Sequence, residues 1–238
     1  MSPSPAPDGA PQRRLYGRRR GRALRLGQRA LVDTLLPTLC FDVPAQDKFD
    51  PKQLFVPTVD EVWLEIGFGA GEHLVFQAAS HPRVGVIGCE VFEPGIARLL
   101  TDIKAQGLAN IRLFTDDARL VTAALAPMSL ARAFILFPDP WPKERHKKRR
   151  IVATETLDHL AEAMVDGAEL RLATDDPDYA AWMEERGDAH PAFERIAMAD
   201  RPADWPATRY ENKAIVAGRP ARLFLYRRRA RPVGLARD

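Results

Sequence analysis

The 238-residue sequence predicts an α/β fold, in which helices cover both faces of a doubly wound, mostly parallel sheet. Apolar strand patterns alternate with helical patterns between residues 62 and 186, as in crossover units that join parallel strands. Residues 64–72 read L-E-I-G-F-G-A-G-E, a strand that runs into three glycines before a helix begins. Open sheets of this kind bind ligands beyond the carboxyl ends of their strands, so a site is expected there.

The predicted elements follow one another in a regular order. Strands are expected at residues 62–66, 84–90, 111–115, 131–137 and 168–174, and two further strands at 193–197 and 221–227. Helices are expected at residues 72–80, 94–106, 118–125, 154–164 and 177–186. Pro94 and Pro177 suit the first turns of their helices. A polar segment, residues 200–220, separates the last two strands.

Positive charge is concentrated at the amino end. The formal net charge is only +3, but eight arginines lie within residues 13–29, and Asp8 is the only acid among the first thirty residues. This stretch is rich in Pro and Gly and poor in apolar residues. We therefore expect residues 1–28 to form a flexible basic arm that grips phosphates, and residues 29–238 to form one domain.

Several protein classes are disfavoured by composition. Cys40 and Cys89 lie far apart and the five histidines lack metal-ligand spacing, so neither a disulfide scaffold nor a metal site is expected. No apolar stretch is long enough for a membrane span, and the amino end lacks the apolar part of a secretion signal. A soluble cytoplasmic protein is expected. An organellar transit peptide is the alternative for the basic arm, although its prolines and glycines disfavour an amphipathic helix.

The glycine turn predicts the kind of ligand. Gly67, Gly69 and Gly71 allow the backbone to approach a ligand closely. A dinucleotide fingerprint needs glycine where Glu72 stands, and this carboxylate would repel a pyrophosphate, so NAD is disfavoured. S-adenosylmethionine has no phosphate and carries an ammonium and a sulfonium, for which Glu65 is a suitable acidic neighbour.

Two more strand ends add to this pattern. Glu90 stands about twenty residues beyond the glycines, where a carboxylate accepts the hydroxyls of an adenosine ribose. Asp116, Asp117 and Ala118 follow the third strand, where an Asp side chain can accept the exocyclic amine of adenine. An ordinary charge at a strand end and a helix N-cap are the alternatives. The order and spacing of the three signals favour S-adenosylmethionine.

The segment F-P-D-P-W-P-K-E-R-H-K-K-R-R at residues 137–150 places an acid and a Trp beside six basic side chains. Asp139 follows a predicted strand, and the prolines on either side of it stiffen its loop. Trp141 either stacks on a base or packs under the loop. The basic residues predict contacts with nucleic-acid phosphates, with a solvated surface as the alternative.

This segment resembles the bacterial tRNA (guanine-N7-)-methyltransferase family, together with E-I-G-F-G-A-G and G-C-E-V-F-E-P-G before it and A-T-D-D and T-R-Y-E after it. The resemblance spans roughly residues 13–226. It implies the Rossmann-like class I methyltransferase fold, S-adenosylmethionine as methyl donor, and tRNA as partner. The implied product is N7-methylguanosine in the variable loop, at guanosine 46. Residues 212–218 resemble one subgroup of the family, and the choice between monomer and homodimer stays open.

The resemblance and the residue pattern together assign candidate site residues, and no metal ligand is among them. Donor contacts are assigned to Glu65, Gly67, Gly69, Gly71, Glu90, Asp117, Ala118 and Asp139. Substrate contacts are assigned to Lys143, Asp175, Thr208, Arg209, Tyr210 and Glu211. RNA contacts are assigned to Arg145, His146, Lys147, Lys148, Arg149 and Arg150. For T-R-Y-E the alternative is a helix capping box, formed by Thr208 and Glu211.

The chemistry limits what the catalytic candidate, Asp139, can do. Guanine N7 carries a lone pair and no proton, so its methylation needs no general base. The Asp139 carboxylate is expected to orient the base and to stabilise the positive charge that the ring gains. Methylation of an adenine amino group is the neighbouring hypothesis, but P-D-P-W lacks the adjacent prolines of a D-P-P-Y-like motif. An RNA-binding protein with a vestigial methyltransferase fold is the alternative outside enzymes.

Overall fold

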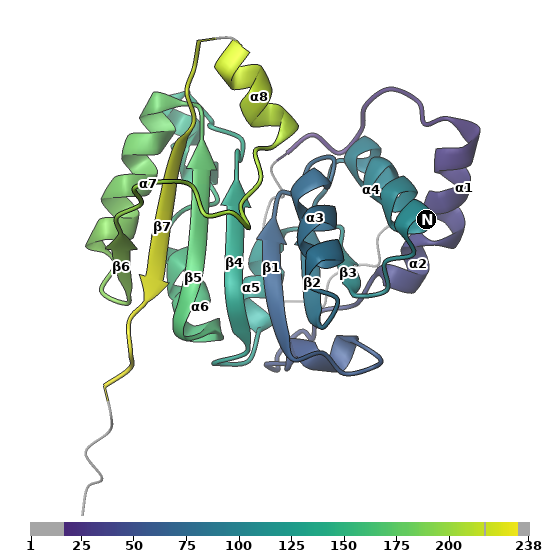
Figure 1. The fold of residues 1–238 in the computed structure, drawn as a ribbon, viewed down its shortest axis with the longest axis horizontal. Helices are drawn as coiled ribbons and strands as arrows, with labels where there is room; N and C mark the ends of the chain where they lie inside the picture. The colour runs from purple at the N-terminus through teal and green to yellow at the C-terminus, as the bar shows by residue number, and fades with distance from the viewer. Residues whose placement is uncertain (1–16, 217, 233–238) are drawn as a thin grey trace, which may run out of the picture.

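A computed structural model of the chain describes residues 17–216 and 218–232, with the backbone alone at residues 209, 210 and 213. Within them, seven strands form one sheet in the order β3-β2-β1-β4-β5-β7-β6 (Figure 1). The strands are β1 Glu61–Ile66, β2 Val84–Cys89, β3 Ile111–Phe114, β4 Leu130–Leu136, β5 Met164–Thr174, β6 Phe193–Ile196 and β7 Arg222–Arg228. Strands β1 to β5 pair in parallel, and β7 is antiparallel to both β5 and β6. The predicted doubly wound, mostly parallel fold is confirmed.

Every predicted helix is present, within a few residues of its expected ends. The α-helices are α1 Leu26–Thr34, α2 Leu36–Leu39, α3 Glu72–Ser80, α4 Glu93–Gln106, α5 Ala118–Ala124, α6 Thr154–Ala163, α7 Pro177–Ala189 and α8 Arg209–Val216. Two 3₁₀ helices, η1 Pro51–Leu54 and η2 Glu144–Arg149, complete the described elements. Helix α8 lies inside the polar segment, where the alternative for T-R-Y-E was a helix capping box formed by Thr208 and Glu211. The Glu211 N–H donates to Thr208 Oγ1 over 3.2 Å at the start of this helix.

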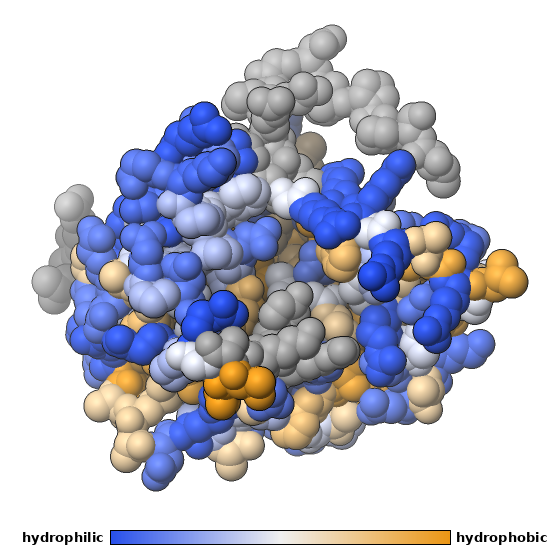
Figure 2. Space-filling view, turned by 90° about the horizontal axis from the view of Figure 1, so that it is seen from above, coloured by the Kyte–Doolittle hydropathy of each residue, from blue (hydrophilic) through white to orange (hydrophobic). Residues whose placement is uncertain are grey.

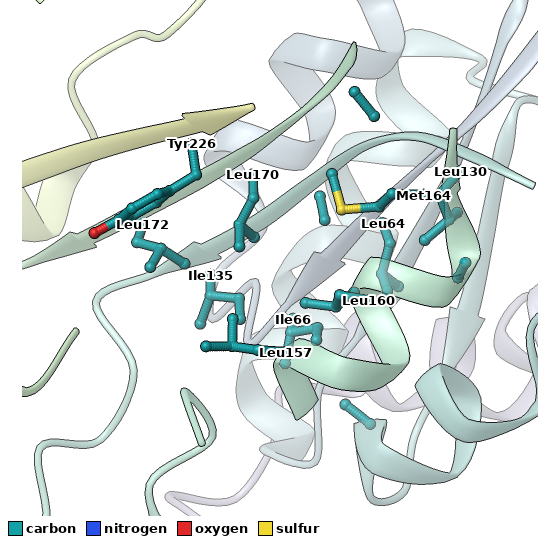
Figure 3. Packing of buried hydrophobic residues seen from close by; sticks show 14 of the residues in the cluster. Leu64, Ile66, Leu130, Ile135, Leu157, Leu160, Met164, Leu170, Leu172 and Tyr226 are labelled. Carbon is teal, nitrogen blue, oxygen red and sulfur yellow. The ribbon is translucent and has the colours of Figure 1, made fainter. Parts of the chain in front are cut away.

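Two apolar layers hold the helices to the sheet. Apolar side chains of α5, α6 and α7 pack on one face, and those of α2, α3 and α4 pack on the other. Figure 3 shows the first layer, in which Leu157 and Leu160 of α6 lie against Leu64, Ile66 and Ile135 of the sheet. Burial of each such side chain contributes about 1.5–3 kcal/mol, so both layers keep the sheet rigid beneath the site.

The strand order determines where the site lies. The chain moves from β1 outward to β2 and β3, then returns to β4 on the other side of β1. Strands β1 and β4 are neighbours in parallel, with Glu65 in register with Phe134. Crossovers therefore leave in opposite directions at this point, and the carboxyl ends of β1 and β4 border a crevice.

The turn between β1 and α3 is tightly packed. Gly71 has φ +82° and a Cβ there would lie 2.7 Å from the Leu99 side chain, so both backbone and space require glycine. Gly95, on α4, approaches the turn even more closely, because a Cβ there would lie 2.1 Å from the Gly69 carbonyl oxygen. Helix α4 therefore supports the glycine turn directly.

Candidate active site

An open cavity of about 580 Å³ lies at the carboxyl ends of the strands. All eight residues predicted to bind the donor line it: Glu65, Gly67, Gly69, Gly71, Glu90, Asp117, Ala118 and Asp139. Trp141, Arg149 and Thr208 also contribute to its wall. Figure 2 looks onto this end of the molecule, whose surface is largely hydrophilic. The volume is in the range of small-molecule sites, and four carboxylates from four strand ends share one space.

The Glu90 carboxylate is held in place by backbone N–H groups. Its Oε2 accepts from Gly69 N over 2.8 Å, and its Oε1 accepts from Val91 N over 2.7 Å and Phe92 N over 2.9 Å. Burial raises the pKa of Glu90 against these hydrogen bonds, and the charge of Asp139 raises it further. Since Oε2 accepts one N–H, it keeps a lone pair for a ligand hydroxyl.

Asp117 caps helix α5. Its Oδ1 accepts from Arg119 N over 3.0 Å, and its Oδ2 pairs with Arg119 Nη1 over 3.0 Å. The N-cap geometry considered for this residue is therefore present, and the carboxylate still lines the cavity. Ala118 is the first residue of the helix, so its N–H has no acceptor within the helix and is available to a ring nitrogen.

Asp139 lies on a loop with unusual backbone geometry. Phe137 and Trp141 have φ values of 52° and 46°, a region that non-glycine residues rarely adopt. Asp139 is exposed at the cavity wall between these two residues, with Pro138 and Pro140 on either side of it. Backbone strain of this kind persists where the surrounding structure imposes it, and it is common in functional loops.

Trp141 is half-buried beside the basic residues 143–150. Its ring lies edge-on to His146 at a centroid distance of 5.9 Å, and the Arg149 guanidinium lies over it at 5.0 Å. Partial burial, followed by the charge of Arg149, lowers the pKa of His146. Stacking of Trp141 on a base stays a prediction.

The basic segment, residues 143–150, divides into exposed and bound side chains. Lys143, Arg145 and Lys148 are exposed, and they form no ion pair with another residue in the described part of the chain. Lys147 pairs with Glu144 over 2.9 Å and with Asp178 over 3.3 Å. The three exposed cations are therefore the ones best placed for phosphates.

Arg150 occupies a different place from the one expected for an RNA contact. It is 1% exposed, its Nε donates to the Pro140 carbonyl over 2.8 Å, and its Nη2 pairs with Asp178. Its guanidinium lies 4.7 Å from the Tyr179 ring centroid and 4.9 Å from that of Trp182. Asp178, Tyr179 and Trp182 all lie on helix α7, so Arg150 connects the Asp139 loop to that helix.

The predicted substrate residues do not all meet at the cavity. Thr208 lines it, whereas Lys143, Asp175 and Glu211 do not. Asp175 pairs with Arg219 over 3.2 Å. Glu211 is buried, and both of its oxygens accept from Arg201. Arg209 and Tyr210 begin helix α8, and their side chains lie outside the described part of the structure.

Other residues at the site escaped the sequence analysis. Gly17 and Arg18, from the predicted arm, line the cavity, and Arg19 pairs with Asp116 over 3.1 Å. Arg119 links Asp117 to the basic segment, because its Nη2 donates to the Arg149 carbonyl over 3.0 Å. Only the positive charge of these arginines was visible in the sequence. Their partners are distant in the chain, so no local pattern could identify them.

Residues 17–216 and 218–232 contain no helix with the length and apolar character needed to cross a membrane. In the same part of the chain, no group of three or more His, Cys, Asp and Glu side chains is arranged to hold a metal ion.

The sheet order and the cavity define a class I methyltransferase fold. The 16S rRNA methyltransferase KamB has a TM-score of 0.54 and is 19% identical, with 73% of this chain and 89% of that chain covered. The aminoglycoside resistance methyltransferase NpmB1 has a TM-score of 0.51 and is 16% identical, with 72% and 89% covered. Residues 60–223 also match the family model described as "Putative methyltransferase".

Closer relatives define a narrower family. The tRNA (guanine-N(7)-)-methyltransferase of Paramagnetospirillum magneticum is 54% identical over 224 residues, which cover 92% of this chain and 94% of that protein. The protein of the same name from Rhodospirillum rubrum is 48% identical, with 92% and 89% covered. The chain belongs to the tRNA (guanine-N7-)-methyltransferase family, and it is a methyltransferase. The resemblance found in the motifs is thereby confirmed.

Proposed function

We propose that this protein transfers the methyl group of S-adenosylmethionine to N7 of a guanosine in the variable loop of tRNA, at guanosine 46. One observation carries the proposal for this member of the family. The four carboxylates Glu65, Glu90, Asp117 and Asp139 line a single cavity, and exposed basic side chains follow Asp139 within a few residues. A cationic donor and a polyanionic acceptor would thus meet at the Asp139 loop.

The residues present fit the methyl donor. Glu90 Oε2 keeps a lone pair for a ribose hydroxyl, and Asp117 and the Ala118 N–H offer an acceptor and a donor to adenine. Glu65 is a buried carboxylate suited to the ammonium of the amino acid part. When bound, S-adenosylmethionine supplies a methyl group activated by the positive sulfonium. The chain supplies orientation and charge.

Asp139 is proposed to act on the guanine. Since N7 has no proton, the carboxylate is not needed as a base, and its stabilisation of the product ring's charge lowers the barrier. It also accepts hydrogen bonds from the N1–H and N2–H edge of the base. The prolines and the two positive φ angles limit the movement of the loop, so little ordering is needed when the base arrives.

The RNA contacts are proposed for the exposed part of the basic segment. Lys143, Arg145 and Lys148 are the side chains for phosphates, and Arg149 is close to Trp141 at the cavity wall. Among the predicted substrate residues whose side chains the structure describes, Thr208 lines the cavity. Residues 1–28 remain a candidate phosphate-gripping arm, and a cytoplasmic location belongs to the same proposal.

The test is methyl transfer to unmodified tRNA with labelled S-adenosylmethionine. The expected result is incorporation into tRNA and chain scission at guanosine 46 after reduction and aniline treatment, which is specific to N7-methylguanosine. A tRNA with adenosine at position 46 is the control and should accept no label. Label without scission would point to an exocyclic amine instead. Binding of donor and tRNA without transfer would favour a vestigial enzyme.

A further inference from the structure

A series of buried hydrogen bonds runs from Glu65 through His73, which also lines the donor cavity, to Gln77 and the Asp204 carbonyl. Glu65 Oε2 lies 2.8 Å from His73 Nδ1, and His73 Nε2 lies 3.0 Å from Gln77 Nε2. Gln77 Nε2 also donates to the Asp204 carbonyl over 2.6 Å. His73 and Gln77 are one turn apart on α3, so they share one face of that helix. Glu65, His73 and Gln77 are each buried.

The donors and acceptors in this series of hydrogen bonds determine where the protons lie. An amide NH₂ only donates, so His73 Nε2 accepts from Gln77 and the ring proton is on Nδ1. His73 Nδ1–H then donates to the Glu65 carboxylate. The reversed amide of Gln77 would put two oxygens 2.6 Å apart at Asp204, which excludes that orientation. His73 is therefore a neutral donor to Glu65, in the tautomer that Gln77 selects.

Asp204, at the far end of this series of hydrogen bonds, is held firmly in place. The Asp204 carboxylate pairs with Arg132 over 2.6 Å and with Arg171 over 2.9 Å. Trp205 is buried next to it, with the Arg171 guanidinium 5.4 Å from its ring centroid. The His73 ring packs edge-on against Phe134 at 4.6 Å. Asp204 is four residues before Thr208, and Thr208 lines the same cavity as Glu65.

We propose that His73 and Gln77 are positioning residues that orient the Glu65 carboxylate for the ammonium group of the methyl donor, with Asp204 as their anchor. This inference rests on the proposed function, because it assumes that the donor carries such an ammonium. With one oxygen held by the His73 N–H, the Glu65 carboxylate presents its other oxygen in one direction. Glu65 and the Thr208 segment thus share one buried support.

The test compares two ligands that differ only near Glu65. S-adenosylhomocysteine contains the amino acid part, whereas 5′-methylthioadenosine has the same adenosine and lacks that part. Calorimetry on the full chain should show that His73→Leu weakens binding of S-adenosylhomocysteine at least about tenfold, with 5′-methylthioadenosine changed less than about twofold. His73→Asn, whose amide N–H replaces Nδ1–H, should keep S-adenosylhomocysteine within about threefold. Gln77→Met should cause the same selective loss, about threefold.

The control uses another pair of imidazole and carboxylate, in which His190 is buried and Asp158 is exposed. His190 Nε2 lies 3.1 Å from Asp158, away from the cavity, and His190→Leu should leave both affinities unchanged. Equal weakening of both ligands by His73→Leu, or no weakening, would overturn the inference, as would an Asn variant as weak as the Leu variant. If His73→Leu does not fold, an unchanged ratio of the two affinities in Gln77→Met overturns it. Failure of the unmodified protein to bind S-adenosylhomocysteine would instead refute the proposed function.

Discussion

The half of the site proposed for the methyl donor and the half proposed for RNA hold their charged side chains in opposite ways. Glu65, Glu90 and Asp117 are each bonded within the protein and largely removed from solvent. Lys143, Arg145 and Lys148 extend from the surface a short distance away. A small ligand of defined shape is recognised best by groups that are already oriented, because less entropy is lost on binding. A long polyanion is attracted by mobile surface charge, which acts over a distance and depends on salt.

Two arginines join these halves. Arg119 pairs with Asp117 and also donates to the Arg149 carbonyl. Arg150 donates to the Pro140 carbonyl and lies against helix α7. Arg119 therefore connects the donor cavity to the basic segment, and Arg150 connects the Asp139 loop to helix α7. Arginine therefore serves structure at positions 119 and 150 and is proposed to bind RNA at position 145, and variants can separate the two roles.

The largest effect is expected at Asp139. Asp139→Ala should lower turnover by about 100- to 1000-fold, because a charge that stabilises the developing cation is lost. Affinities for donor and tRNA should stay within about tenfold, as measured by calorimetry and filter binding. Asp139→Asn should lower turnover to a similar extent, because the amide loses the charge and keeps only one acceptor for the guanine N1–H and N2–H. Full activity of the Ala variant would remove Asp139 from the catalytic role.

Arg150→Met should mainly affect stability. Loss of the hydrogen bond to Pro140 and of the packing on Tyr179 and Trp182 should cost about 2–3 kcal/mol in chemical denaturation. The salt dependence of tRNA binding should not change. Arg150 also lowers the pKa of Asp178, so the pair stabilises the fold at neutral pH, and this contribution disappears as pH falls through the folded-state pKa. A reduced salt slope with unchanged stability would reverse the assignment.

Arg145→Ala with Lys148→Ala should do the opposite. Loss of two phosphate contacts should reduce the slope of log affinity against log salt by up to about two units. Unfolding free energy should change by less than about 0.5 kcal/mol, because both side chains are exposed. Filter binding over a salt series measures the slope. An unchanged slope would mean that the RNA lies on another surface.

The smallest effect is expected from pH at Glu90. Because burial raises the pKa of Glu90, its carboxylate takes up a proton at a higher pH than an exposed Glu does. The protonated group is a poorer acceptor for ribose hydroxyls, so binding of 5′-methylthioadenosine should weaken as pH falls below neutral. That ligand has no amino acid group that titrates in this range. Constant affinity across the series would argue against a ribose contact at Glu90.

The donor half could be predicted from sequence because its signals are local. Glu65, Glu90, Asp117 and Asp139 each follow or end a strand, and parallel strands bring their carboxyl ends to one edge. Strand polarity and a glycine turn were therefore enough to gather all eight donor residues at one cavity. Their roles toward the ligand stay predictions. The position of the Asp139 loop after β4 could be derived in the same way.

The substrate half could not be predicted to the same depth. The six adjacent basic residues 145–150 look equivalent in the sequence. In the structure, Arg150 pairs with Asp178 on helix α7, and Lys147 pairs with Asp178 and Glu144. Asp175 and Glu211 were expected at the substrate, and each pairs with an arginine ten or more residues away in the chain. The series of hydrogen bonds from Glu65 to Asp204 also links residues that are distant in sequence.

The sequence by itself determined the class of fold and the order of the site motifs, because these follow from periodicity, turn chemistry and chain connectivity. It indicated the family through the resemblance of its motifs. Only the tertiary structure decided which charged side chains remain exposed to a partner and which are bound inside. The physical reason is that burial and ion pairing depend on elements that meet across the fold. Arg150 and Arg145 carry the same charge, but only Arg150 is covered by helix α7.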